Sequence, residues 1–229
     1  MNIYEEKDDF EDQKEVIKVV LIGETGVGKT SIISQFVNQI FQEDLQPSTG
    51  GTFNSKSFIF EDGKILKFNI WDTAGQEKYR ALSKLFYKDA NAAILVYDIT
   101  NQNSFEELQN YWAKEIKETS ISNVIIAIVA NKSDLIEKEI VNEDDARKLA
   151  KELNGIFLQC SAKNSVGIDD IFIEITKKYT GREDFHILNE ESEKNSEKDQ
   201  KEETIISKSG TLRLSVDKTF TKNKKRKCC

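Results

Sequence analysis

A glycine-rich stretch near the N-terminus has the spacing of a phosphate-binding loop. Residues 23–30 read Gly-Glu-Thr-Gly-Val-Gly-Lys-Thr, so four residues separate Gly23 from Gly28, and a lysine and a hydroxyl residue follow. The glycines allow backbone N–H groups to turn toward phosphate oxygens. Lys29 could then reach the outer phosphates, and the Thr30 hydroxyl could hold Mg²⁺. The competing interpretation is a glycine-rich turn without a ligand.

A second stretch, Trp-Asp-Thr-Ala-Gly-Gln-Glu at residues 71–77, follows a strand-like run. Asp72 would lie at the carboxyl end of that strand, where a carboxylate can hold Mg²⁺ through its water shell. Gly75 would let a backbone N–H approach a terminal phosphate. The Gln76 amide both donates and accepts hydrogen bonds, so it could orient an attacking water. The alternative is an ordinary junction between a strand and a loop.

Two further polar stretches follow strand-like runs and suit recognition of a base. In Asn-Lys-Ser-Asp, residues 131–134, the Asp134 carboxylate can accept two hydrogen bonds from guanine, which adenine cannot donate. Lys132 could lie along the base, and Asn131 could tie this loop to the phosphate loop. In Cys-Ser-Ala-Lys, residues 160–163, the backbone N–H groups could reach the base oxygen. Cys160 itself is expected to be a small buried residue, because no histidine is placed to activate it.

Composition excludes several other kinds of chemistry. The 229 residues include 33 Lys and Arg against 40 Asp and Glu, which gives a net charge of −7 and argues against general nucleic-acid binding. His186 is the only histidine, so histidine-dependent triads and multi-histidine metal sites are excluded. Three cysteines argue against a disulfide framework and fit a reducing compartment. No apolar run reaches the ~18 residues of a membrane span.

Strand-like and helical patterns alternate through the first three quarters of the chain. Several strand-like runs are continuously apolar, as expected of strands that are covered on both faces. This alternation predicts an α/β fold with a mostly parallel sheet. The expected strands are residues 16–22, 58–60, 66–71, 92–97, 124–130 and 156–159. The expected helices are residues 31–41, 104–119, 143–153 with Asn142 as N-cap, and a stripe from 168 to 179.

The chain divides into three regions on composition. Residues 1–15 form an acidic leader without the apolar core of a secretory signal, and we expect them to be disordered. Residues 16–180 form the predicted domain. Residues 181–229 form a polar tail that we expect to be disordered and that ends in a basic run and the pair Cys228-Cys229.

The four motifs, taken together and in this order, resemble those of the small Ras-like GTPases. Residues 67–71, 86–90 and 95–100, together with the paired terminal cysteines, are similar to the Rab branch. The resemblance covers residues 16–180 and the end of the tail. It implies a P-loop NTPase G domain, an α/β fold with a six-stranded, mostly parallel sheet, one antiparallel edge strand and five flanking helices.

The resemblance also locates a first switch loop, Gln-Pro-Ser-Thr-Gly-Gly-Thr-Phe at residues 46–53. On this register Thr49 coordinates Mg²⁺ and senses the γ-phosphate, although Gly50 replaces the usual apolar residue and should loosen the loop. The implied catalytic residues are Gln76 and Lys29, and the implied metal ligands are Thr30, Thr49 and, through water, Asp72. The residues implied to bind GTP are Thr25, Gly26, Val27, Gly28, Lys29, Thr30, Ser31, Thr49, Gly75, Asn131, Lys132, Asp134, Ser161, Ala162 and Lys163.

The resemblance implies a switch that binds GTP or GDP with Mg²⁺, hydrolyses GTP slowly and regulates vesicle-mediated membrane traffic. Expected partners are an exchange factor, a GTPase-activating protein, effectors that read the two switches, a prenyl-transfer escort and a GDP-dissociation inhibitor. Lipidation at Cys228 and Cys229 would anchor the chain, expected to be monomeric, to the cytoplasmic face of an intracellular membrane. The early endosome is favoured from similarity in residues 71–100 and 123–135.

Two other functions are compatible with these motifs. One is a scaffold that binds GTP without cycling, against which the intact Gln76 argues. The other is an ATP-using phosphate-loop enzyme such as a small kinase, against which Asp134 argues. Phe53, Trp71 and Phe86 are candidates for a hydrophobic surface that partners read, and plain core packing is the alternative for each of them.

Overall fold

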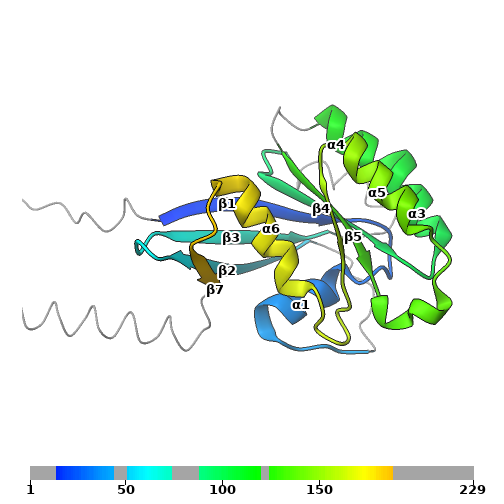
Figure 1. Cartoon of the computed structure of the whole chain (residues 1–229), viewed down its shortest axis with the longest axis horizontal. Helices are drawn as coiled ribbons and strands as arrows, with labels where there is room; N and C mark the ends of the chain where they lie inside the picture. Colours follow the sequence, from blue (N-terminus) through cyan, green and yellow to red (C-terminus); the bar gives the residue numbers. More distant parts are fainter. Residues whose placement is uncertain (1–13, 44–50, 74–87, 120–123, 188–229) are drawn as a thin grey trace, which may run out of the picture. The chain divides into compact units, whose positions relative to one another are not determined.

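The computed structural model is built on a seven-stranded sheet with the order β6-β5-β4-β1-β3-β2-β7 (Figure 1). Strands β1, β3, β4, β5 and β6 run parallel, whereas β2 is antiparallel to β3 and β7 is antiparallel to β2. The mostly parallel α/β class that the sequence predicts is therefore confirmed. The strands are β1 (Lys14–Ile22), β2 (Thr52–Phe60), β3 (Ile65–Asp72), β4 (Ala92–Asp98), β5 (Ile125–Asn131), β6 (Ile156–Gln159) and β7 (Phe185–Ile187).

The structure describes residues 14–43, 51–73, 88–119 and 124–187, all of which belong to one compact unit. Within these ranges five α-helices connect the strands. They are α1 (Lys29–Asn38), α3 (Gln102–Glu107), α4 (Ala113–Thr119), α5 (Glu143–Glu152) and α6 (Ile168–Thr180). A π-helical stretch, Leu108–Trp112, joins α3 to α4, and a 3₁₀ stretch, Ser133–Lys138, follows β5. Within the described ranges, no helix combines the length and apolar character that a membrane crossing demands.

The apolar runs of the central strands supply two separate cores. In β1, Ile17, Val19 and Leu21 face one side and Val20 and Ile22 face the other, all with no exposed surface. The first side packs against α1 and α6, and the second packs against the α3–α4 run and α5 (Figure 1). A strand that is covered on both faces needs apolar residues at every position, because alternate side chains point to opposite faces. This is why the sequence pattern is continuous rather than alternating.

Aromatic packing fastens α1, α6 and the β2–β3 pair to each other. The rings of Phe36 and Phe172 stack with centroids 3.6 Å apart, and both side chains are buried. Phe58 packs against Phe68 at 5.0 Å. The face of the sheet that α1 and α6 cover is thus stabilised by large aromatic side chains. Each contributes about 1.5–3 kcal/mol to the free energy of folding when fully buried.

The helix boundaries follow local capping. The side chain of Asn142 accepts a hydrogen bond from the Asp144 N–H at 2.8 Å, as its predicted N-cap role requires. The helix expected over residues 31–41 begins at Lys29 and ends at Asn38. It ends early because Gln39 adopts a left-handed conformation with φ 57°, and its N–H bonds back to Gln35.

The seventh strand lies in the stretch that sequence analysis assigned to the tail. Phe185 packs edge-to-face on Phe58 at 5.6 Å and on Phe60 at 5.5 Å. Arg182 holds the turn before it, because its guanidinium pairs with Asp62 at 2.9 Å and also with Asp184. These partners are distant in sequence, so the short polar stretch around β7 carries no strand pattern of its own. The sheet therefore has seven strands rather than the expected six.

Candidate functional site

A cavity of about 390 Å³ lies at the carboxyl ends of the parallel strands and the N-terminus of α1. This is the edge at which open α/β sheets bind ligands. All four sequence motifs contribute to its wall. The lining residues are Thr25, Gly26, Gly28, Lys29, Thr30, Ser31, Phe41, Gln42, Glu43, Thr73, Asn131, Lys132, Asp134, Leu135, Ala162 and Lys163. The second motif contributes Thr73 to the wall and Asp72 next to it.

Two glycines give the phosphate loop its shape. Gly23 has φ 146°, and a Cβ there would lie 2.2 Å from the Val96 carbonyl oxygen. Gly28 has φ 96°, caps the N-terminus of α1, and leaves room for the Asn131 amide, since a Cβ would lie 2.3 Å from Asn131 Nδ2. Only glycine fits either position, because both steric room and backbone conformation exclude a side chain. The loop consequently presents the first N–H groups of α1 to the cavity.

Lys29 is held inside this loop by two backbone carbonyls. Its ammonium donates to the carbonyl oxygens of Gly23 at 2.9 Å and Glu24 at 2.8 Å, and only 6% of the residue is exposed. Burial lowers the pKa of Lys29 to about 8, although the Asp72 and Glu24 carboxylates oppose this shift. A phosphate group beside the ammonium would favour the charged form and raise this pKa again.

Thr30 and Asp72 meet at the cavity although 42 residues separate them. The Thr30 hydroxyl donates to Asp72 Oδ2 at 2.5 Å, and Asp72 is buried at the end of β3. A hydroxyl and a carboxylate are hard oxygen ligands of the kind that Mg²⁺ takes together with water and phosphate oxygens. The residues present therefore fit that ion.

Asn131 connects three of the motif loops. Its Nδ2 donates to the Val27 carbonyl oxygen at 2.8 Å, as sequence analysis predicts, and its Oδ1 accepts from the Ala162 N–H at 3.3 Å. Oδ1 also lies 3.4 Å from the Cys160 sulfur. Asn131 is buried, so these bonds are shielded from water. The phosphate loop and both base loops thus form one hydrogen-bonded unit.

The base-side carboxylate and lysine each have a fixed partner. The Ser161 hydroxyl donates to Asp134 Oδ1 at 2.6 Å, and Lys132 Nζ lies 2.7 Å from Asp98 Oδ2. Lys132 adopts a left-handed conformation with φ 67°, which turns the chain from β5 into the 3₁₀ stretch. Asp98 was not singled out from the sequence, since its role depends on the pairing of β4 with β5.

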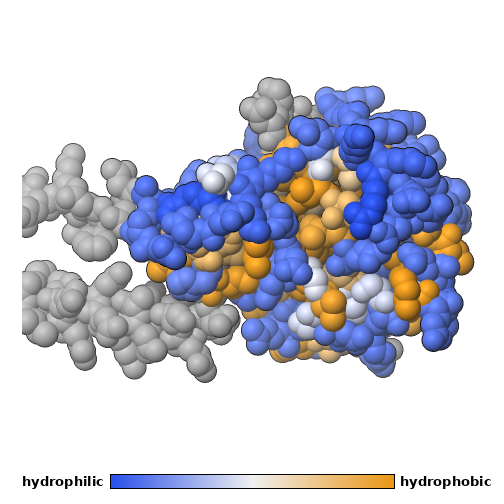
Figure 2. Space-filling model, viewed as in Figure 1, coloured by the Kyte–Doolittle hydropathy of each residue, from blue (hydrophilic) through white to orange (hydrophobic). Residues whose placement is uncertain are grey.

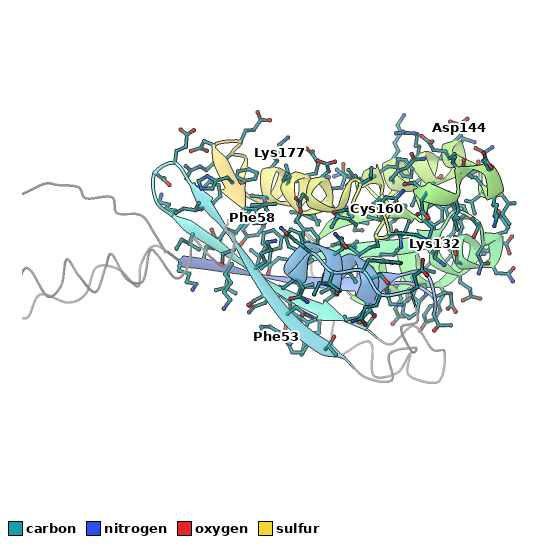
Figure 3. All side chains as sticks on the ribbon, turned by 90° about the horizontal axis from the view of Figure 1, so that it is seen from below. Phe53, Phe58, Lys132, Asp144, Cys160 and Lys177 are labelled. Atoms are coloured by element: carbon teal, nitrogen blue, oxygen red, sulfur yellow. The ribbon has the colours of Figure 1, made fainter. Side chains whose placement is uncertain are left out.

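Cys160 is fully buried, and burial raises the pKa of its thiol. A thiol that remains protonated is a poor nucleophile. Figure 3 shows Cys160 inside the fold, with Lys132 labelled nearer the loop end of the strands. Cys160 is therefore a small buried residue rather than a nucleophile, as the sequence predicts.

The structure places most predicted nucleotide-binding residues on one wall. Val27 and Ser161 are buried and are not among the lining residues, but each is hydrogen-bonded to one of them, Val27 to Asn131 and Ser161 to Asp134. Predictions that fall on residues outside the described ranges are Thr49, Gly75, Gln76, Phe86, Cys228 and Cys229.

Five lining residues were not predicted. Thr73 donates its hydroxyl to the Leu21 carbonyl oxygen at 2.6 Å, which fastens the chain after β3 to β1. Phe41, Gln42 and Glu43 follow α1, and Leu135 follows Asp134. Thr73 lies within the second motif and Leu135 directly follows the third, and these positions are a signal that could have found them. The other three carry no such pattern in the sequence.

Comparison with known proteins agrees with this geometry. Residues 18–181 match the Ras family. The chain is 43% identical to the Ras-related protein Rab-22A of Homo sapiens and to that of Canis lupus familiaris, and 41% identical to that of Mus musculus. Each similarity spans 162 residues, which are 71% of this chain and 82% of the relative. The chain therefore belongs to the Ras family of small GTPases and is a Rab-like member that binds guanine nucleotides and hydrolyses GTP.

Proposed function

We propose that this Rab-like GTPase is a membrane-anchored switch for vesicle traffic and that the described cavity is its nucleotide site. The observation that supports this assignment is that Asn131 joins the phosphate loop to both base loops by hydrogen bonds. Lys29, Thr30 and Asp134 line the same cavity, with Asp72 hydrogen-bonded to Thr30. In this assignment Gly26, Gly28 and Ser31 offer backbone N–H groups to phosphates. Asp134, Lys132 and Ala162 recognise guanine.

The residues of this site divide the work of hydrolysis. Lys29 and the loop N–H groups hold the β- and γ-phosphate oxygens and stabilise charge that develops there. Gln76 orients the water that attacks in line with the departing GDP oxygen. Thr30, Thr49 and, through water, Asp72 would hold Mg²⁺, which would supply further neutralisation of charge on the phosphate oxygens.

The intrinsic reaction is expected to be slow. No arginine lies between Lys29 and Trp71, so the first switch has none to offer. An activating protein would supply the missing stabilisation, which is worth on the order of 10³–10⁵-fold. Slow hydrolysis makes the chain a timer, because the γ-phosphate holds Thr49 and Gly75 until it is cleaved.

Effectors are proposed to read an aromatic pair on the sheet that consists of the exposed Phe53 and the half-buried Trp71. Phe53 and Trp71 are paired across β2 and β3, their rings meet edge-to-face at 5.4 Å, and Phe53 is 52% exposed. Figure 3 places Phe53 on the outer side of β2, away from Phe58, which points toward α6. A large exposed aromatic of this kind suits an interface.

The proposed anchor is the tail. Two prenyl chains on Cys228 and Cys229 would give durable attachment, because each buried CH₂ contributes about 0.8 kcal/mol. The preceding basic run would add about 1 kcal/mol per charge at an anionic surface. The favoured membrane is the early endosome, with cycling through the cytosol. Similarity to the Rab-22A proteins supports a Rab-type role, and the compartment is our proposal.

Nucleotide competition and single-turnover hydrolysis test this site. We expect GTP and GDP, but not a thousandfold excess of ATP, to displace a fluorescent GDP, and Gln76→Leu to slow hydrolysis without loss of binding. Displacement by ATP would favour the phosphate-loop enzyme. GTP binding without any turnover, even in the wild type, would favour the scaffold.

Two measurements in the native cell test the anchor and the compartment. Intact-mass analysis should find both terminal cysteines prenylated, and unmodified cysteines would refute the anchor. Imaging of the N-terminally tagged chain beside an internalised fluid-phase tracer should show overlap within minutes. Signal on Golgi or secretory membranes alone would refute the endosomal assignment and leave the GTPase untouched.

A further inference from the structure

An ion pair links two segments that line the nucleotide cavity. Lys163 Nζ lies 2.7 Å from Glu43 Oε1, and both residues line the cavity. The two are 120 residues apart in the chain. Glu43 lies in the segment that follows α1, and Lys163 lies in the base loop after β6. The pair therefore joins two lining segments that are distant in the sequence.

The segment that carries Glu43 is placed by the end of α1. Gln39 turns the chain out of the helix in a left-handed conformation, and the Ile40 N–H bonds to the Ser34 carbonyl oxygen at 3.4 Å. Phe41 then packs against the core beside α1 and lines the cavity. Residues 39–43 are thus held at their start by the helix and the core, and at Glu43 by the ion pair.

The Lys163 side is fixed independently of Glu43. The Ala162 N–H donates to Asn131 Oδ1, and Ser161 pairs with Val166 in an isolated bridge. The Asn164 N–H donates to the Ser161 hydroxyl at 3.1 Å, which closes a tight turn around Lys163. A rigid base loop gives the Glu43 carboxylate a stationary partner.

We infer that Glu43 is a positioning residue that acts through Lys163 as a latch and slows the release of bound guanine nucleotide. The inference rests on the proposed nucleotide site. Phe41, Gln42, Glu43 and Lys163 all line the cavity that would hold the nucleotide, so a widening of the cavity between these two segments would break or stretch the pair. The recognised ligand is the guanine nucleotide already assigned, and Glu43 tunes how long it stays.

The electrostatics set the size of the effect. The Glu43 side chain is 69% exposed and that of Lys163 is 53% exposed, so water and salt screen the pair. The hydrogen bond between them still lowers the pKa of Glu43 and raises the pKa of Lys163. An exposed pair of this kind corresponds to roughly a two- to fivefold change in rate.

The test measures release of a preloaded fluorescent GDP analogue from the full chain after addition of excess GDP. Glu43→Gln should release it roughly two- to fivefold faster than the wild type. Glu174→Gln is the matched control, because it also removes one exposed carboxylate from an ion pair, here with Lys177 at 2.8 Å on α6. The control should match the wild type.

Two further readouts separate a latch from general loosening. Raising the salt concentration should accelerate release from the wild type and narrow its difference from Glu43→Gln. Lys163→Met keeps an alkyl stem, and Glu43→Gln should have no added effect in that background. Equal release from Glu43→Gln and the wild type, or full additivity with Lys163→Met, would overturn the latch. Failure of the wild type to bind the analogue at all would instead refute the nucleotide site.

Discussion

The side-chain amide of Asn131 donates a hydrogen bond to the Val27 carbonyl oxygen at 2.8 Å, which joins the end of β5 to the phosphate loop. The same side chain accepts from the Ala162 N–H, so one buried residue sets the distance between the phosphate and base ends of the cavity.

Removal of Asn131 should therefore damage both stability and nucleotide retention. We expect Asn131→Ala to lower the free energy of unfolding by about 2 kcal/mol, because it leaves buried backbone groups without partners. GDP release should accelerate at least about tenfold for the same reason. Asn142→Ala is the control, since it removes a helix cap worth ~1 kcal/mol and should leave GDP release unchanged. Denaturant unfolding and stopped-flow release give the two numbers.

The crowding at Gly28 predicts that an alanine is tolerated less well there than at Gly26 in the same loop. Both Gly26 and Gly28 have positive φ, so an alanine strains the backbone at either position by ~1 kcal/mol. Only at Gly28 does the new Cβ meet Asn131 Nδ2, at 2.3 Å. We expect Gly28→Ala to weaken GDP binding much more than Gly26→Ala. Equilibrium titration of a fluorescent GDP would check this, and equal losses would contradict the crowding argument.

The buried Lys29 predicts a pH dependence of binding. The pKa of Lys29 is about 8 without a ligand, and we expect bound phosphates to keep the ammonium charged. Above about pH 8 the ligand-free protein has lost this proton, so nucleotide binding must be accompanied by protonation of Lys29. Affinity for GDP should fall by about fourfold between pH 7 and 8.5. Lys29→Met should bind weakly and lose this slope. Competition titrations across this range would measure it, and a slope that persists in Lys29→Met would assign the proton elsewhere.

The same pKa fixes the sign for folding of the nucleotide-free protein. The unfolded chain keeps Lys29 protonated up to about pH 10.5, whereas the folded chain loses that proton near pH 8. The unfolded state therefore binds more protons between these values, and the Lys29 contribution to stability rises with pH across this window. Comparison of wild type with Lys29→Met by denaturant unfolding isolates that contribution.

Strand β7 predicts that the folded unit extends past Gly181. Phe185 is half-buried against Phe58 and Phe60, so Phe185→Ala should lower the free energy of unfolding by ~1.5–2.5 kcal/mol, half the cost of a fully buried Phe. His186→Ala, on the exposed position of the same strand, should change it by less than about 0.5 kcal/mol. Thermal or denaturant unfolding compares the two, and equal effects would mean that β7 does not pack as described.

The sequence alone determined the class of fold, the family and most of the cavity wall. The continuous apolar runs of β1, β4 and β5 indicate strands covered on both faces, and the phosphate loop carries its own spacing. These features are local, because each depends on residues within a few positions of one another. Asp134 and Lys29 could therefore be placed at a ligand before any contact was known.

Only the tertiary structure decided the features that join distant segments. Three ion pairs connect residues that share no sequence pattern. They are Glu43–Lys163, Lys132–Asp98 and the Arg182–Asp62 pair at the turn before β7. Residues 52–57 of β2 were also missed, because most of them are polar and only Ser57 is buried. The physical reason is common to all of them. A hydrophobic period records burial along one element, whereas an ion pair or an edge strand depends on which other element folding brings beside it.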